Sequence, residues 1–210
     1  MADDPVFCGL AVIFTFIFLL SVRSFFKILP SLWDCILRWK GNLELEDSLQ
    51  LSGSRNLIAV IIFVPLCMVA YSHDLYHPDF FDALPHWLQL PALIACMLVY
   101  VILRSFLNWQ LEMGSYRTKT FTAANRSFLN FMIILFTVLF PTGAILRIFI
   151  GNEELAGAVL LHVAALVYAF HIFRRGQIFA SACNPFTTFL YLCGLELLPT
   201  AALVVSARLL

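Results

Sequence analysis

The chain has 210 residues, of which 61% are hydrophobic and only 12% charged, with a mean hydropathy of +0.90 and a formal net charge of zero. Soluble globular proteins are about 45–50% apolar and about 25% charged, so this composition excludes an ordinary soluble domain. It predicts a protein that is surrounded mainly by the hydrocarbon of a membrane.

Six apolar runs approach the length that a membrane crossing requires, which is about 20 residues of helix for roughly 30 Å of hydrocarbon. We therefore predict an all-α polytopic membrane protein with about six transmembrane helices, in which residues 1–210 form a single integral membrane domain. The predicted spans are residues 5–22, 57–72, 88–103, 128–150, 155–173 and 185–205.

The first predicted span is expected to stay attached rather than to act as a cleaved signal. A secretory signal begins with basic residues and ends at a small-residue cleavage site. Here Asp3 and Asp4 precede the apolar run, and the basic residues follow it. This reversed charge order favours a helix that is retained and runs from the outside to the inside of the cell.

An amphipathic segment, residues 24–40, follows the first span. Phe25, Leu29 and Trp33 recur at helical spacing on one face, and Lys27 begins a polar stripe on the other. A basic face opposite an aromatic one is typical of a helix that lies in the membrane interface. We predict an interfacial amphipathic helix that anchors the first span, with a docking surface for a cytoplasmic partner as the alternative.

Basic residues are distributed unevenly between alternate connectors. All but two of the 13 Lys and Arg residues follow the first, third or fifth predicted span, the exceptions being Arg147 and Arg208. Because basic residues are retained on the cytoplasmic side, these connectors are predicted to face the cytoplasm and both termini the outside. Topology thus explains the basic residues, and no nucleic-acid partner is predicted. The connector residues are Arg23, Lys27, Arg38, Lys40, Arg55, Arg104, Arg117, Lys119, Arg126, Arg174 and Arg175.

The connector between the second and third spans is rich in histidine and aspartate, which are residue types that bind divalent metals such as zinc. Their spacing matches no standard metal site, and Pro78 interrupts any helix there. We predict no metal site, and an interfacial cap is the favoured interpretation. The weak candidates for metal ligands are His73, His77, Asp79, Asp82 and His86.

Glu196 is the most costly residue of the sequence, because it lies near the middle of the sixth span. A charged side chain there costs about 2.5–3.5 kcal/mol on insertion scales, so a partner or a function is expected. Pro199 cannot donate a hydrogen bond to the carbonyl of Leu195, which leaves an acceptor beside the carboxyl group. Gly194 allows another helix to approach closely.

His162 is the predicted partner of Glu196. At about 1.5 Å of rise per residue, both lie roughly 10–13 Å below the outer surface, in spans joined by a short connector. Tyr168 and Tyr191 are expected at similar depth further in. This group is either a proton relay or substrate site, or a buried polar pair that fixes helix packing. His171 is nine residues from His162 and therefore on the opposite face, so the two cannot hold one haem or metal.

Motifs of common enzyme classes are missing from the sequence. It has no Cys-x-x-Cys pair, no Gly-x-x-x-x-Gly-Lys phosphate loop and no Gly-x-Ser-x-Gly elbow. No catalytic residue and no cofactor are predicted, and ATP or serine hydrolysis can be set aside.

The sixth span carries a distinctive motif, since residues 189–199 read Phe-Leu-Tyr-Leu-Cys-Gly-Leu-Glu-Leu-Leu-Pro. This resembles the closing motif Tyr-Leu-Cys-x-Leu-Glu-x-Leu-Pro of a family of uncharacterised bacterial inner-membrane proteins, a domain of unknown function. Family members have threonine where this chain has Gly194. The resemblance implies a multi-pass protein of the bacterial inner (cytoplasmic) membrane and supplies no activity. It marks Tyr191, Cys193, Glu196 and Pro199 as a unit.

Two classes of function follow from these patterns. The favoured hypothesis is a non-enzymatic accessory or assembly subunit of an envelope complex, because the chain is small and its predicted loops are short. The alternative is a small proton-coupled transporter that uses Glu196 with His162. An intramembrane enzyme would need more polar groups at one depth than these. The expected partners are the lipid bilayer and either other membrane proteins or a second copy of the chain.

Overall fold

The computed structural model describes residues 5–114, 119–149 and 152–209, and all regular structure in these ranges is helical. The predicted all-α class is therefore confirmed. In chain order the elements are α1 (Pro5–Leu37), α2 (Gly41–Asp47), α3 (Leu49–Ser72), the short 3₁₀ turn η1 (Asp79–Phe81), α4 (His86–Gly114), α5 (Lys119–Phe149), α6 (Glu153–Ala180), α7 (Pro185–Leu192), the π-helical turn η2 (Cys193–Leu197) and α8 (Leu198–Leu209).

Six helical segments among the described residues are long and apolar enough to cross a membrane, in agreement with the predicted number. Each is longer than the apolar run that predicted it. The segments are Val6–Leu37, Leu49–Ser72, His86–Gln110, Thr120–Phe149, Glu153–Ala180 and Pro185–Ser206. The additional helical turns include polar and charged residues, among them Arg104 in α4 and Arg175 in α6.

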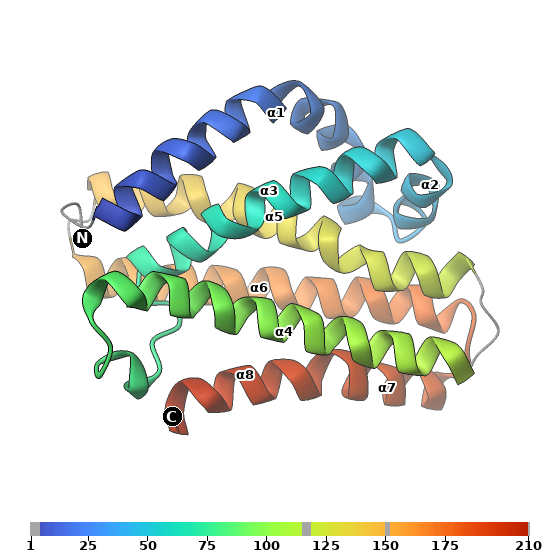
Figure 1. Ribbon diagram of the computed structural model, residues 1–210. Helices are drawn as coiled ribbons and strands as arrows, with labels where there is room; N and C mark the ends of the chain where they lie inside the picture. The colour runs from blue at the N-terminus through green and yellow to red at the C-terminus, as the bar shows by residue number, and fades with distance from the viewer. Residues whose placement is uncertain (1–4, 115–118, 150–151, 210) are drawn as a thin grey trace.

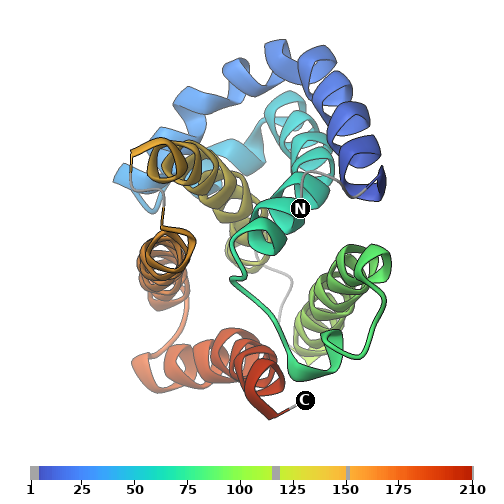
Figure 2. The same cartoon turned by 90° about the vertical axis from the view of Figure 1, so that its left-hand side faces the viewer.

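The helices form two groups when the bundle is viewed along its length (Figure 2). One group contains α1, α3 and α5, with α3 packed against both of the others. The other contains α4, α6 and the α7–α8 segment, and α6 joins the groups through an extensive contact with α5. Both ends of the chain lie at one end of the bundle, whereas α2 and the C-terminal ends of α4 and α6 lie at the other (Figure 1).

The predicted interfacial segment, residues 24–40, is not a separate element. Its residues 24–37 continue α1 without a break through Pro30, and α1 curves over the bundle (Figure 1). Proline removes one backbone hydrogen bond and bends a helix without always ending it. The face that packs on the bundle differs from the predicted apolar face, because Ile28 and Leu32 are buried whereas Leu29 and Trp33 are exposed.

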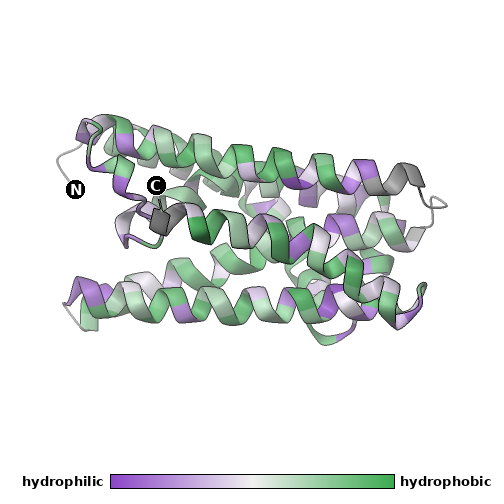
Figure 3. Cartoon of the chain, turned by 90° about the horizontal axis from the view of Figure 1, so that it is seen from below, coloured by the Kyte–Doolittle hydropathy of each residue, from purple (hydrophilic) through white to green (hydrophobic). Residues whose placement is uncertain are grey.

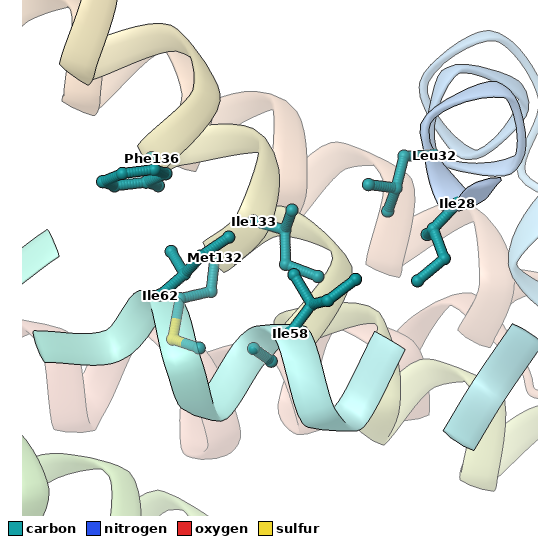
Figure 4. Packing of buried hydrophobic residues seen from close by; sticks show 8 residues of the cluster. Ile28, Leu32, Ile58, Ile62, Met132, Ile133 and Phe136 are labelled. Carbon is teal, nitrogen blue, oxygen red and sulfur yellow. The ribbon is translucent and has the colours of Figure 1, made fainter. Parts of the chain in front are cut away.

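The main apolar core lies between α1, α3 and α5 (Figure 4). Each helix contributes side chains three or four residues apart, which is the spacing that places them on one face. In a membrane such packing is stabilised by van der Waals contact rather than by release of water. The core residues are Ile28, Leu32, Ile58, Ala59, Ile62, Met132, Ile133 and Phe136.

Hydrophobic residues predominate along the helices, and many of the hydrophilic residues lie towards the helix ends (Figure 3). Large side chains such as Val12, Leu20, Val60 and Leu166 are more than 70% exposed. A soluble protein buries such residues, so this surface is suited to lipid.

Two local features set the ends of elements. Gly41 begins α2 so close to α1 that an added Cβ would lie 2.7 Å from the backbone carbonyl of Asp34. At the end of α3, Asp74 has a positive φ of 48°, with Leu75 N–H bonded to the carbonyl of Ala70 and Asp74 N–H to that of Tyr71. These two bonds define a Schellman ending, in which the residue after the cap adopts the left-handed conformation.

Candidate functional site: a buried charge cluster

Glu196 lies in the π-helical turn η2, inside the bundle and fully buried. The N–H of Leu198 bonds to the carbonyl of Cys193, five residues earlier, so the turn holds one residue more than an α-helical turn. Pro199 follows and has no N–H to donate. The widened turn and the proline together place the Glu196 side chain among α4 and α6.

Two arginines surround the Glu196 carboxylate. Arg104 of α4 faces both oxygens, through Nη2 to Oε1 and through Nε to Oε2 at 3.3 Å. Arg175 of α6 forms an ion pair with Oε1 through Nη1. The side chains of Arg104, Arg175 and Glu196 are at most 4% exposed. Arginine suits this site because its planar fork matches the geometry of a carboxylate.

His171 completes the cluster, with Nε2 at 3.6 Å from Oε1 of Glu196. The ring is buried against the side chain of Phe131 in α5, with 4.7 Å between ring centroids. Neither ring nitrogen has a hydrogen-bond partner. The ring of Phe128, also in α5, lies 3.9 Å from the guanidinium carbon of Arg104 and offers it a cation–π contact.

A further set of polar side chains supports the charged ones. Asn108 accepts a hydrogen bond from Nη2 of Arg175 at 2.8 Å and donates one to the carbonyl of Arg104 at 2.8 Å. The Tyr168 hydroxyl lies 3.0 Å from the carbonyl oxygen of Glu196 and 2.6 Å from Oγ1 of Thr200. Tyr100 contacts the same threonine at 3.1 Å. The Glu196 carbonyl oxygen in the π turn therefore accepts a hydrogen bond from the Tyr168 hydroxyl.

The sequence produces this cluster through helical spacing on three elements. Residues three or four positions apart lie on one face of a helix, and each element turns one such polar face towards the other two. The contributing sets are Tyr100, Arg104 and Asn108 in α4; Tyr168, His171 and Arg175 in α6; and Glu196 and Thr200 in η2 and α8.

Of the residues predicted for the site, Glu196 and Tyr168 belong to the cluster and His162 does not. His162 is exposed, and its Nδ1 lies 2.7 Å from the carbonyl oxygen of Ala158, four residues earlier on its own helix. Equal depth in the membrane does not bring two side chains together unless they also face each other around their helices. Because His171 faces Glu196, His162 must point to the opposite side of α6.

The other predicted members lie near the cluster without joining it. Tyr191 packs on Phe179, with ring centroids 5.6 Å apart, and also contacts Phe121 edge-on. Cys193 begins the π turn and is partly buried, and Pro199 is buried in the first turn of α8.

Sequence interpretation missed Arg104, Arg175 and His171. The apolar runs end at Leu103 and Phe173, so charge counting places Arg104 and Arg175 in cytoplasmic connectors, whereas the helices continue beyond them. His171 lies within the predicted span, where it is considered only together with His162 as a haem or metal pair. The spacing of Tyr100, Arg104 and Asn108 was an available signal for a buried polar face.

A second ion cluster lies where α2 meets α3 and α5. Glu46 pairs with the fully buried Arg55 and, at 2.9 Å, with the partly exposed Arg126. Nearby, Asn130 donates to Oδ1 of Asn42 at 2.8 Å. These contacts attach α2 to the end of the bundle.

The weak metal candidates do not converge. His77 Nε2 lies 2.9 Å from Oδ1 of Asp82, whereas His86 interacts with Gln89 and Tyr71. Within residues 5–114, 119–149 and 152–209, no three His, Cys, Asp or Glu side chains are grouped so that they could hold a metal ion.

Comparison with known proteins gives no match to a protein-family model, to a curated protein or to a solved structure. The chemistry of the cluster is therefore the basis for a functional proposal.

Proposed function

We propose that this chain is a non-enzymatic accessory or assembly subunit of an envelope complex in the bacterial inner membrane. The observation that carries the proposal is that the Glu196 carboxylate is occupied on both oxygens by cations of its own chain. Such an acid serves to hold α4, α6 and η2 together. Removing one partner of a buried ion pair typically costs about 3–5 kcal/mol.

The bacterial inner membrane is proposed from the resemblance of residues 189–199 to the closing motif of the family. The orientation is proposed from charge, with both termini outside and the basic connectors in the cytoplasm. The position of both chain ends at one end of the bundle is compatible with it (Figure 1). The proposed partners are the lipid bilayer and either other membrane proteins or a second copy of the chain, and no nucleic acid.

A proton-coupled transporter is the second candidate, with His171 in the place of His162. It is favoured by one observation, namely that both nitrogens of His171 are without hydrogen bonds beside Glu196. Such a transporter requires protons to reach and leave Glu196 during each cycle.

Complementation of a deletion strain by Glu196→Gln distinguishes the two candidates, provided that membrane abundance is measured in the same cells. For a structural ion pair we expect abundance and function to fall together. Normal abundance with lost function would contradict the accessory role and favour transport. Glu154→Gln is the matched control, because Glu154 is exposed at the start of α6.

The accessory role also predicts that the deletion strain lacks a membrane complex or contains it in an incomplete form. We expect at least one large membrane complex to disappear from, or shift in, native gels of the deletion strain, and to return with the wild-type gene. An unchanged set of complexes, together with a transport defect, would contradict the proposal.

A further inference from the structure

The buried cluster contains more positive than negative charge. Arginine stays protonated in proteins, so Arg104 and Arg175 bring two positive charges and Glu196 brings one negative charge. Among the described side chains, Glu196 is the acidic group that these arginines contact. The balance is at least one positive charge, whether His171 is neutral or protonated.

The surrounding groups moderate this excess without cancelling it. The ring faces of Phe128 and Phe179 lie over Arg104 and Arg175, and such contacts attract a cation only weakly compared with an anion. Asn108 accepts one hydrogen bond from Arg175 and carries no charge. An uncompensated charge inside a membrane bundle is costly, so a counterion is expected.

Hydrogen-bonding capacity also remains unused at the same place. Both nitrogens of His171 and Nε of Arg175 are buried without hydrogen-bond partners. His171 and Arg175 are four residues apart and so lie on the same face of α6. Nε–H of Arg175 and the protonated ring nitrogen of His171 are donors. These unpartnered donors are an observation independent of the charge balance, and they call for an acceptor.

We propose that the cluster binds one small monovalent anion, of the class of chloride, next to His171 and Arg175. The four residues of the cluster are at most 3% exposed, which favours a small ion over a large organic acid or a lipid headgroup. Two nearby guanidinium groups attract it, and the Glu196 carboxylate limits the charge so that one anion restores neutrality. This inference does not depend on the proposed accessory role.

The test uses the full chain in detergent, with thermal unfolding followed by the fluorescence of its four tryptophans. Sodium chloride replaces sodium gluconate at constant ionic strength, because gluconate is too large for the site. We expect the unfolding temperature to rise with chloride and then saturate, as mass action requires for a ligand of the native state. Equal unfolding temperatures in both salts, or an equal rise in sodium sulfate, would overturn the proposal.

The proposal predicts opposite changes of chloride affinity in two variants. Arg175→Gln removes the excess charge, so chloride should bind at least ten-fold more weakly. Glu196→Gln adds to the excess, so chloride should bind at least ten-fold more tightly, although the protein is less stable overall. A purely structural cluster would lower stability in both variants and leave the response to chloride the same. Arg126→Gln is the control, since this partly exposed arginine also pairs with a glutamate and should keep the wild-type response.

Equilibrium dialysis with radioactive chloride gives a second measurement for any variant that unfolds too easily. We expect about one chloride per wild-type chain, and less than a tenth of that occupancy in Arg175→Gln at the same concentration. Absence of bound chloride from the folded wild-type protein would reject the site.

Discussion

Asp74 occupies a left-handed backbone conformation, with φ of 48°, two residues after the end of α3. Glycine adopts this conformation without steric cost, whereas aspartate tolerates it less well. Asp74→Gly should therefore raise the free energy of unfolding by about 0.5–1 kcal/mol. Thermal or denaturant unfolding of the solubilised protein measures this change. Asp74→Ala is the contrasting variant and should destabilise the protein, because alanine does not favour the left-handed conformation. A higher free energy of unfolding in Asp74→Ala would show that this backbone conformation is not the cause of the effect.

His73 links stability to pH. Burial lowers its pKa below the ordinary 6.5, Arg147 lowers it further, and Glu153 and Asp74 offset part of the shift. Because the unfolded chain binds the proton more readily, the stability contribution is complete above about pH 6.5 and decreases as the pH falls towards the lower pKa of the folded state.

The difference between wild type and His73→Gln isolates this effect from other titrating groups. We expect the unfolding temperature of the wild type to fall more steeply than that of His73→Gln when the pH is lowered from about 7.5 to 5. Parallel curves for the two proteins would contradict the assignment.

At the level of single residues, sequence reasoning identified Glu196 because the cost of a carboxylate inside an apolar run is visible in the sequence itself. It could not identify the partners. Arg104 and Arg175 stand next to the ends of apolar runs, where hydropathy alone does not distinguish a residue that faces water from one that faces the bundle. Depth can be estimated from one helix, but direction around the helix depends on its neighbours.

At the level of elements, the contact between α1 and α2 depends on a missing side chain. An added Cβ at Gly41 would lie 2.7 Å from backbone atoms of Asp34 and 2.9 Å from the backbone nitrogen of Cys35. Backbone atoms cannot relieve such a clash by a change of rotamer, as a flexible side chain could. Gly41→Ala should lower the free energy of unfolding by about 1–3 kcal/mol, as overpacking does. Limited proteolysis should then cut the α1–α3 connection faster.

Gly53→Ala is the matched control for this prediction. Gly53 lies within α3, and nothing stands within 4 Å of a Cβ added there. Alanine is the better helix former by about 1 kcal/mol, so this variant should be neutral or more stable. Equal losses from both substitutions would show that close approach of α1 is not the reason.

The helices themselves were largely predictable, since each predicted span corresponds to a helix long enough to cross a membrane. The segment predicted as a separate interfacial helix, residues 24–40, instead continues α1 as far as Leu37, and this part of α1 packs against α3 and α5. The π turn could not be foreseen either. Pro199 indicated a disturbed backbone, but its form depends on contacts with Tyr168 and the arginines.

For the whole molecule, the proposed orientation predicts where labels can reach. Cysteines placed near the two chain ends of a cysteine-free variant should react with an impermeant maleimide in intact spheroplasts. A cysteine placed at the exposed Lys40 should react only after the membrane is opened. Reversed reactivity would invert the topology, and reactivity of the two ends from opposite sides would contradict an even number of crossings.

The charge cluster also affects the order in which the molecule can be completed. Arg104 and Arg175 precede Glu196 in the chain, so ribosomes deliver both cations to the membrane before their carboxylate exists. Until η2 is inserted, α4 and α6 carry charges that lipid cannot accommodate well. We therefore expect α4 and α6 to reach their final packing only after the segment that contains Glu196 has been synthesised and can pair with the two arginines. A chain interrupted before that point would keep two arginines without their carboxylate partner.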